Sequence, residues 1–248
     1  MKTLSLSLQG RAGNQSLQFL FAWHYARVHE FKFECGPWVG EALFDLPKYD
    51  RPTPAYLPRY SELDLAKMDD PPSESFEFRG YAQTQFCADY YNKRTVQRLF
   101  TIRPEVARVC ERRRPENESI VIHRRVGDLI GYGYPAVSWL SYVRACEEYG
   151  FDINKAVVLS EENPTPHDDL PDELAFAPDF YRMIKAKTLL RANSTFSFLA
   201  AILSHGLVLS PVIEGLAGGK EHDNVPFVAG VWPRFANLDF VQNMHIDL

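Results

Sequence analysis

Hydrophobic positions follow two different periods along this chain and predict alternating strands and helices. Residues 2–8 alternate between polar and apolar side chains, and apolar side chains recur at helical spacing over 14–29. The segment 31–34 predicts a second strand. Two glycines, Gly10 and Gly13, lie between the first strand and the helix. A strand, a glycine turn, a helix and a strand in this order open a Rossmann-like unit.

The rest of the first half is less regular. Residues 35–74 are rich in proline and predict a long irregular stretch, either an acceptor-binding loop or a surface excursion pinned by its prolines. The elements predicted after it are a strand at 75–81 and helices at 85–100 and 104–113. Residues 115–118 are polar and break the pattern, so we place a domain boundary between 1–117 and 118–248.

The second half alternates regularly between the two periods. An apolar run predicts a buried strand at 119–125. Further strands are predicted at 156–159, 188–190 and 207–211, and helices near 138–149, 179–186 and 193–204. Strands that alternate with helices of this length predict a parallel sheet, and hence an α/β fold.

Composition and charge exclude several classes of protein. The chain has 248 residues, of which 46% are hydrophobic, and a net charge of −5, so it offers no global basic field for nucleic acid or an anionic membrane. Its four cysteines are scattered without a C-x-x-C pair, which disfavours a zinc site or a disulfide scaffold and fits a reducing compartment. No segment resembles a signal peptide or a membrane span, and we expect a cytoplasmic protein.

The strand at 119–125 runs into a cluster of charged side chains. Its end reads His123-Arg124-Arg125, and Asp128 follows closely. Side chains alternate across a strand, so His123 and Arg125 share one face and Arg124 takes the other. A guanidinium offers a planar fork of donors suited to phosphate, and ligands of open α/β sheets bind beyond the carboxyl ends of strands. The position of Arg125 at the strand end therefore predicts an anion-binding site. The alternative is a solvated cluster of charges at the end of a strand.

Two further strand ends carry groups that a nucleotide would use. These groups are Ser160, Glu161 and Glu162 after one strand, and Asn193, Ser194 and Thr195 after the next. The carboxylates suit a ribose or a base amine, and the backbone N–H groups at a helix start favour an anion. The alternatives are a solvated loop and an ordinary helix cap. Because carboxyl ends of parallel strands share an edge, we expect the three strand ends to converge.

The glycine turn of the first half is a fourth candidate. Gly10, Arg11, Ala12, Gly13 and Asn14 join a strand to a helix, where glycines let the backbone approach a ligand closely. The turn lacks the third glycine of a dinucleotide fingerprint and the lysine–hydroxyl pair of a P-loop. A P-loop phosphotransferase is therefore disfavoured.

Five motifs in chain order resemble those of the α-1,2-fucosyltransferases, glycosyltransferase family 11. The family's G-x-x-G-N-Q is similar to residues 10–15, its G-Y-x-Q to 80–83, its H-x-R-R-G-D to 123–128, its S-D-D to 160–162 and its A-N-S-T-F-S-W to 192–198. Arg11 is also similar to the G-R-F-G-N-Q opening of protein O-fucosyltransferases, in a wider superfamily with α-1,6-fucosyltransferases. The chain departs from the family pattern at Val126, which replaces an arginine, at the glutamates Glu161 and Glu162, and at Phe198.

The resemblance implies a GT-B-like fold, in which two Rossmann-like domains face each other across a cleft. It assigns 1–117 to the acceptor side and 118–248 to the GDP-sugar donor. It also implies an inverting, metal-independent transfer of L-fucose from GDP-fucose to a glycan hydroxyl, in α-1,2 linkage, with no cofactor beyond the donor. The absence of a D-x-D pair agrees with metal independence.

Residue roles follow from the resemblance. Arg125 stabilises the departing diphosphate, together with backbone donors of the glycine turn and of the helix start at Ser194. Asp128 either deprotonates the acceptor or anchors its loop, and Asn14 contacts the donor or the acceptor. His123 orients the end of its strand. Two alternatives stay open, namely a transferase for another GDP-sugar and a catalytically silent nucleotide-sugar-binding protein.

Overall fold

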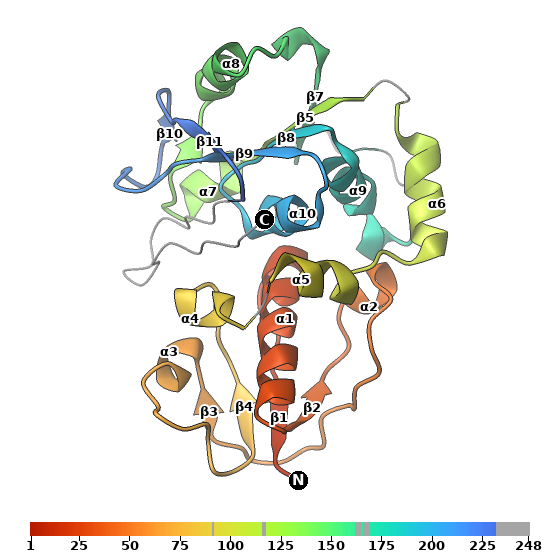
Figure 1. The fold of residues 1–248 in the computed structure, drawn as a ribbon, viewed down its shortest axis with the longest axis vertical. Coiled ribbons are helices and arrows are strands. Elements are labelled where there is room, and N and C mark those ends of the chain that lie inside the picture. The colour runs from red at the N-terminus through yellow and green to blue at the C-terminus, as the bar shows by residue number, and fades with distance from the viewer. Residues whose placement is uncertain (91, 116–117, 162–164, 166–168, 232–248) are drawn as a thin grey trace. The chain divides into compact units, whose positions relative to one another are not determined.

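Two units, Met1–Ile102 and Arg103–Leu248, make up the chain, and each is organised around its own sheet. The structure is a computed structural model that describes residues 1–90, 92–115, 118–161, 165 and 169–231. Figure 1 draws the first unit in red to yellow and the second in green to blue. The predicted α/β class, with two Rossmann-like domains, is confirmed, and the cleft between the domains stays a prediction.

The first unit contains four parallel strands in the order β2-β1-β4-β3. Its elements in chain order are β1 (Thr3–Leu6), α1 (Ala12–Val28), β2 (Lys32–Cys35), α2 (Gly40–Leu43), β3 (Arg59–Tyr60), α3 (Glu62–Leu65), β4 (Phe76–Phe78), α4 (Gln85–Ala88) and α5 (Lys93–Leu99). The strands and the helix that the hydrophobic pattern predicts at the start of the chain are confirmed as β1, α1 and β2, and the later predicted strand as β4.

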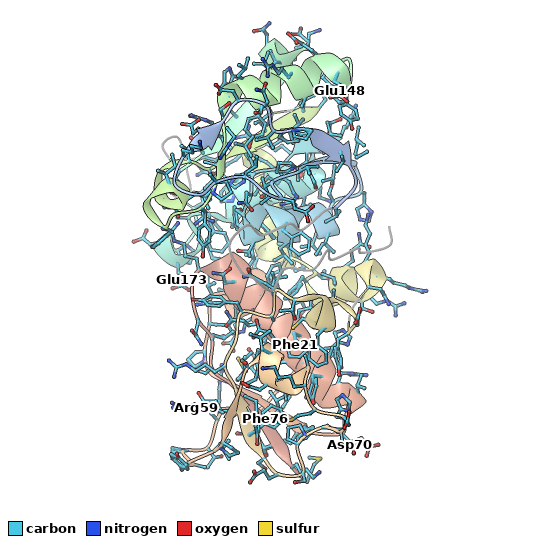
Figure 2. All side chains as sticks on the ribbon, turned by 90° about the vertical axis from the view of Figure 1, so that its left-hand side faces the viewer. Phe21, Arg59, Asp70, Phe76, Glu148 and Glu173 are labelled. Carbon is cyan, nitrogen blue, oxygen red and sulfur yellow. The ribbon has the colours of Figure 1, made fainter. Side chains whose placement is uncertain are left out.

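Aromatic rings hold α1 against this sheet. The ring centroids of Phe21 on α1 and Phe78 on β4 are 5.0 Å apart, and Tyr25 meets Phe76 edge-on. Figure 2 shows Phe21 and Phe76 among the closely spaced side chains of the first unit. Tilted and edge-on pairs are the arrangements that aromatic rings prefer. This packing places the start of α1, with its glycine turn, at the carboxyl edge of β1.

The middle of the first unit differs from the prediction in two ways. The irregular stretch 35–74 contains the short elements α2, β3 and α3. The single helix predicted at 85–100 is instead two helices, α4 and α5. The reason is local, because the Asn92 side chain accepts a hydrogen bond from the backbone N–H of Thr95 at 3.0 Å and so starts α5 as a separate helix.

The second unit contains a five-stranded sheet in the order β11-β9-β8-β5-β7, parallel except for β11. Its helices and strands are α6 (Pro104–Arg113), β5 (Ile120–Arg124), α7 (Gly127–Gly131), β6 (Ala136–Val137), α8 (Trp139–Glu148), β7 (Ala156–Ser160), α9 (Ala177–Lys185), β8 (Thr188–Leu190), α10 (Thr195–Leu203), β9 (Leu207–Pro211), β10 (Glu221–His222) and β11 (Phe227–Ala229). The predicted strands at 188–190 and 207–211 match β8 and β9 to the residue.

Helices cover both faces of this sheet. Figure 1 shows α8 on one face and α9 and α10 on the other. Ile120 and Ile122 of β5 pack with Tyr142 of α8, and His123 of β5 lies 5.8 Å from the ring of Phe196 on α10. A strand covered on both sides is apolar over most of its buried length, as β5 is over 120–122. Its charged side chains therefore fall only at its carboxyl end.

The boundary between the units differs from the predicted boundary at 117/118. The units divide at 102/103, so α6 belongs to the second unit. The polar segment 115–118 breaks the helical pattern and for that reason looked like a linker. The helix before it packs against α9, which ties it to the second sheet.

Several short elements described in the second unit have no counterpart in the sequence prediction. They include the helix α7 and the strands β6, β10 and β11. None is longer than five residues, which is too short for a hydrophobic period to be recognised in the sequence. Pairing between β6 and β10 depends on residues far apart in the chain, Ala136 with Glu221 and Val137 with His222.

A buried ion pair joins the segment just before β5 to α9, and we expect its loss to have a large effect on stability. The Glu118 side chain is fully buried, and its Oε2 accepts a hydrogen bond from Nε of Arg182 at 2.7 Å. We expect Glu118→Ala to lower the free energy of unfolding by about 3–5 kcal/mol, because the Arg182 charge is left buried without its partner. Urea unfolding followed by circular dichroism measures the change.

An exposed ion pair of the same unit provides the control. Lys155, whose side chain is 76% exposed, lies 3.5 Å from the Asp152 carboxylate. Lys155→Ala should change the free energy of unfolding by no more than about 0.5 kcal/mol. Equal losses in the two variants would contradict a special role for the buried pair.

Candidate functional site

The sheet of the second unit places the predicted strand ends together. In the order β9-β8-β5-β7, the chain runs to one side of β5 to form β7 and to the other side to form β8. This makes the carboxyl ends of β5 and β8 a topological switch point, where ligands of open α/β sheets bind. Arg124 pairs with Ser160 across β5 and β7, and Ile122 pairs with Leu190 across β5 and β8. The predicted convergence of the three strand ends is confirmed.

Arg125 forms a two-point contact with Asp128 directly after β5. Its Nε donates to Asp128 Oδ1 at 2.9 Å, and its Nη2 donates to Oδ2. Both side chains are mostly buried, at 18% and 15% exposed. The carboxylate occupies the Nε–Nη2 edge of the planar guanidinium and so fixes its plane. Glu161 approaches from the end of β7, with Oε1 4.0 Å from Arg125 Nε.

Strand alternation separates Arg124 from Arg125 as predicted. Arg124 Nη2 lies 3.7 Å from Oε2 of Glu221 on β10. His123 lies on the other face of β5, against Phe196 of α10. The two neighbouring arginines therefore have different surroundings, and only Arg125 is held by the carboxylate in its own motif.

His123 is a buried, neutral imidazole. Burial, together with the smaller effect of the positive charges of Arg125 and Arg191, lowers its pKa to about 3. Its backbone carbonyl accepts a hydrogen bond from the hydroxyl of Tyr142 at 3.0 Å, which ties the end of β5 to α8. A base this weak is a poor proton acceptor at neutral pH. The geometry therefore fits the predicted role in orienting the strand end.

Arg191 is a further cation at this edge, and it is absent from the sequence prediction. It follows β8 and is only 2% exposed, over the ring of Phe198 on α10. Its Nε donates to Ser210 Oγ at 2.8 Å and its Nη1 to the Ala192 carbonyl at 3.0 Å. Burial lowers its pKa to about 9, so the side chain stays charged at neutral pH. Among the described residues it forms no ion pair with a carboxylate, so no carboxylate directly neutralises its positive charge.

The side chains at the start of α10 form an ordinary helix cap. Ser194 Oγ accepts the backbone N–H of Ser197 at 3.1 Å. Asn193 Nδ2 donates to the Pro135 carbonyl at 3.3 Å and so ties the segment before α10 to the segment before β6. Thr195 is the first residue of the helix and is half-buried. Any anion bound here would meet backbone N–H groups, since the Asn193 and Ser194 side chains serve the fold.

The remaining predicted residues of the second unit lie at the end of β7. Ser160 is its last residue and is half-buried, and the Glu161 side chain is 51% exposed. Glu162 lies outside the described residues. Glu161 is therefore exposed enough to contact a ligand. Its carboxylate also lies close to the Arg125 guanidinium.

The glycine turn of the first unit is held by glutamines. Gln18 clamps the backbone of Gln9, accepting its N–H at 2.8 Å and donating to its carbonyl at 3.0 Å. Gln15 Nε2 donates to the Gly10 carbonyl at 3.0 Å. Gly10 has φ +75°, and a Cβ added there would lie 2.6 Å from Asn14 Nδ2. Glycine suits this position, because residues with a Cβ rarely adopt this backbone conformation and a Cβ would have to displace the Asn14 amide.

A second motif reaches the same turn. Gln83, from the segment after β4, donates from Nε2 to Asn14 Oδ1 at 3.1 Å. The strands β1 and β4 are neighbours in the sheet, and β2 lies on the other side of β1. The first unit therefore also brings two motifs together at its switch point. Arg11, the residue before α1, contributes no side-chain cap to the helix, and Ala12 and Gly13 begin its first turn.

Solved structures with a similar fold include fucosyltransferases. NodZ α-1,6-fucosyltransferase soaked with GDP-fucose matches with a TM-score of 0.59 and 12% identity, over 93% of this chain and 100% of that chain. Fucosyltransferase NodZ from Bradyrhizobium gives a TM-score of 0.60 at 11% identity, over 93% of this chain and 99% of that chain. POFUT1 in complex with GDP gives 0.51 at 12% identity, over 89% of this chain and 97% of that chain. These matches show that the chain has a GT-B-like fold.

The sequence comparisons found nothing. No protein-family model and no curated protein matches the chain. Within the part of the chain that the structure describes, no helix is long and apolar enough to cross a membrane. In the same residues, no group of three or more histidine, cysteine, aspartate and glutamate side chains is arranged to hold a metal ion.

The buried His123 predicts a pH dependence of stability. Its folded pKa, about 3, lies below its ordinary value of 6.5, so its contribution is complete above pH 6.5 and is lost as the pH falls toward 3. Below pH 6.5 the unfolded wild-type chain binds a proton at His123 that the folded protein does not bind. His123→Gln removes this difference in bound protons. We expect the variant to lose less stability between pH 6.5 and pH 4, by up to about 1.4 kcal/mol per pH unit. Urea titrations at several pH values measure the two slopes.

The exposed His205 provides the matched control. His205→Gln should leave the acid slope of the wild-type protein unchanged. If His123→Gln also leaves the slope unchanged, the neutral state of the buried imidazole is wrong.

Proposed function

We propose that this protein is a glycosyltransferase that transfers L-fucose from GDP-fucose to a hydroxyl group of a glycan acceptor. The observation that carries the proposal is the Arg125–Asp128 pair at the switch point of the second sheet. Three further features support it: the five motifs in fucosyltransferase order, the GT-B-like fold, and neighbours of similar fold described with GDP or GDP-fucose. The second unit binds the donor, and the first unit serves the acceptor.

The main requirement of this reaction is to stabilise the negative charge that develops on the leaving group, GDP. The bond between the fucose anomeric carbon and the diphosphate oxygen breaks, and the electron pair leaves with GDP. The acceptor oxygen forms the new bond on the opposite face of the sugar, with inversion, and its proton passes to a base. A fixed guanidinium stabilises the growing negative charge without having to reorganise. Arg125, aligned by Asp128, has that geometry, and Arg191 adds positive charge at the same edge.

Asp128 acts as an anchor in this proposal. Both of its carboxylate oxygens contact Arg125, so deprotonating an acceptor would break the pair that aligns the cation. The transfer is metal-independent, because arginines supply the positive charge that a divalent ion supplies in other transferases. The five motifs favour an α-1,2 linkage. The four cysteines are all free, which supports a reducing, cytoplasmic location.

The role of Arg125 is tested by release of GDP from GDP-fucose in the presence of a panel of galactoside acceptors. We expect Arg125→Ala to lower turnover by about a hundred- to a thousandfold, because one preorganised donor to the leaving group is lost. Arg124→Ala is the matched control, since its guanidinium faces Glu221 instead, and it should keep most of the activity. Near-wild-type turnover of Arg125→Ala in a folded protein would contradict the proposal.

The anchor role of Asp128 predicts non-additive effects. We expect Asp128→Asn to slow turnover, and the double variant Arg125→Ala with Asp128→Asn to be within roughly threefold of Arg125→Ala alone. A separate catalytic base would instead multiply the two losses. The pH–rate profiles of the single variants distinguish the cases, because only removal of a base would abolish the acidic limb.

A further inference from the structure

A buried carboxylate in the first unit holds the segment that carries Gln83. Glu62, the first residue of α3, is only 6% exposed. Its Oε1 accepts the backbone N–H groups of Tyr81 at 3.1 Å and of Ala82 at 3.0 Å. Its Oε2 lies 1.7 Å from the position that a Cβ would take on Gly80. The carboxylate therefore fits against the backbone of 80–82, and any side chain at Gly80 would displace it.

This segment has a backbone conformation that needs support. Ala82 has φ +53°, in the left-handed region that residues with a Cβ rarely adopt. Two hydrogen bonds from consecutive N–H groups to one carboxylate hold the turn in that conformation. Burying a carboxylate is costly, and among the described residues Glu62 forms no ion pair with a cation. The buried carboxylate therefore interacts with the two backbone N–H groups of the turn, and holding the turn is its structural role.

The turn 80–82 also orients the Asn14 amide. Gln83 follows Ala82 directly and donates from Nε2 to Asn14 Oδ1 at 3.1 Å. With its oxygen bound to Gln83, Asn14 directs Nδ2 to the other side, toward Gly10. The amide nitrogen can only donate, so the Gln83 contact determines that Asn14 offers a donor at the glycine turn.

We propose that Glu62 is a positioning residue for Asn14, acting through the turn 80–82 and the Gln83 side chain. The role in turnover rests on the proposed function, in which Asn14 acts on the reacting sugar or its acceptor. The mechanical link from Glu62 to the glycine turn does not rest on it. Loss of the Glu62 carboxylate releases the turn and weakens the Gln83 contact that orients the Asn14 amide. Turnover should fall, because the glycine turn acts on the departing diphosphate, while affinity for the intact donor should stay unchanged because the second unit supplies most of the proposed contacts to it.

The same short helix offers a matched control. Asp64 forms a capping box with Ser61, accepting the backbone N–H of Ser61 at 2.8 Å, while Asp64 N–H donates to Ser61 Oγ at 3.3 Å. Asp64 thus stabilises the start of α3 without contacting the turn 80–82. Asp64→Ala loosens the helix as Glu62→Ala does, but leaves the carboxylate that holds the turn in place.

The experiment combines amide hydrogen exchange with steady-state kinetics on GDP-fucose. Glu62→Ala should speed exchange of the Tyr81 and Ala82 amides by at least about tenfold and speed exchange over 10–15, whereas Asp64→Ala should change neither. Glu62→Ala should also lower kcat by roughly ten- to a hundredfold with KM for GDP-fucose unchanged. Glu62→Gln, which keeps an acceptor oxygen, should retain most of the slow amide exchange and most of the wild-type kcat. The double variant with Asn14→Ala should be no slower than Asn14→Ala alone.

Several outcomes would overturn the inference. They are wild-type kcat in Glu62→Ala, equal losses in Asp64→Ala, or multiplied losses in the double variant. If the wild-type protein does not turn over GDP-fucose, the proposed function fails, and exchange over 10–15 still decides whether Glu62 holds the glycine turn. If Glu62→Ala does not fold, Gly80→Ala replaces it, because its added Cβ would displace the carboxylate. Unchanged exchange over 10–15 in that variant also contradicts the inference.

Discussion

A parallel strand that is covered on both faces can carry charged side chains only where it leaves the sheet. β5 follows this constraint, with Ile120 and Ile122 packed on the side of α8 and its charges gathered at the carboxyl end. Alternation then sends Arg124 toward β10 and His123 toward α10. Arg125, just beyond the strand, is aligned by a carboxylate one helical turn away. The position and direction of the proposed catalytic cation follow from the burial of the strand before it.

The first unit uses the same architecture, but two neutral amides meet at its switch point. Its switch point joins the glycine turn after β1 to the segment after β4, through the contact between Asn14 and Gln83. Charge lies one step further back, in the buried Glu62 that holds the turn. The two units thus differ chemically at equivalent places in their sheets. One presents guanidinium groups suited to a diphosphate, and the other presents amides and backbone suited to hydroxyl groups.

Hydrophobic periodicity was sufficient to predict the long elements and the edge where the motifs meet. The strands β8 and β9 and the helix α6 match their predictions to the residue. Arg191 and Glu62 could not be found in this way, because their importance lies in contacts with residues distant in sequence, Ser210 and the turn 80–82. Arg191 also ends an apolar strand, where an arginine gives no signal of being buried. The unit boundary was misplaced because a polar loop inside the second unit has the same composition as a linker.

The central claim is that the carboxyl edge of the second sheet recognises a guanosine diphosphate through Arg125. Isothermal titration of the full chain with GDP, GMP and UDP tests it most directly. GDP should bind at least about tenfold more tightly than GMP, since a charge-assisted contact to the second phosphate is worth roughly 1.5–3 kcal/mol, and Arg125→Ala should remove that difference. UDP should bind more weakly than GDP. Equal affinities for GDP and GMP, or a preference that survives Arg125→Ala, would contradict the account.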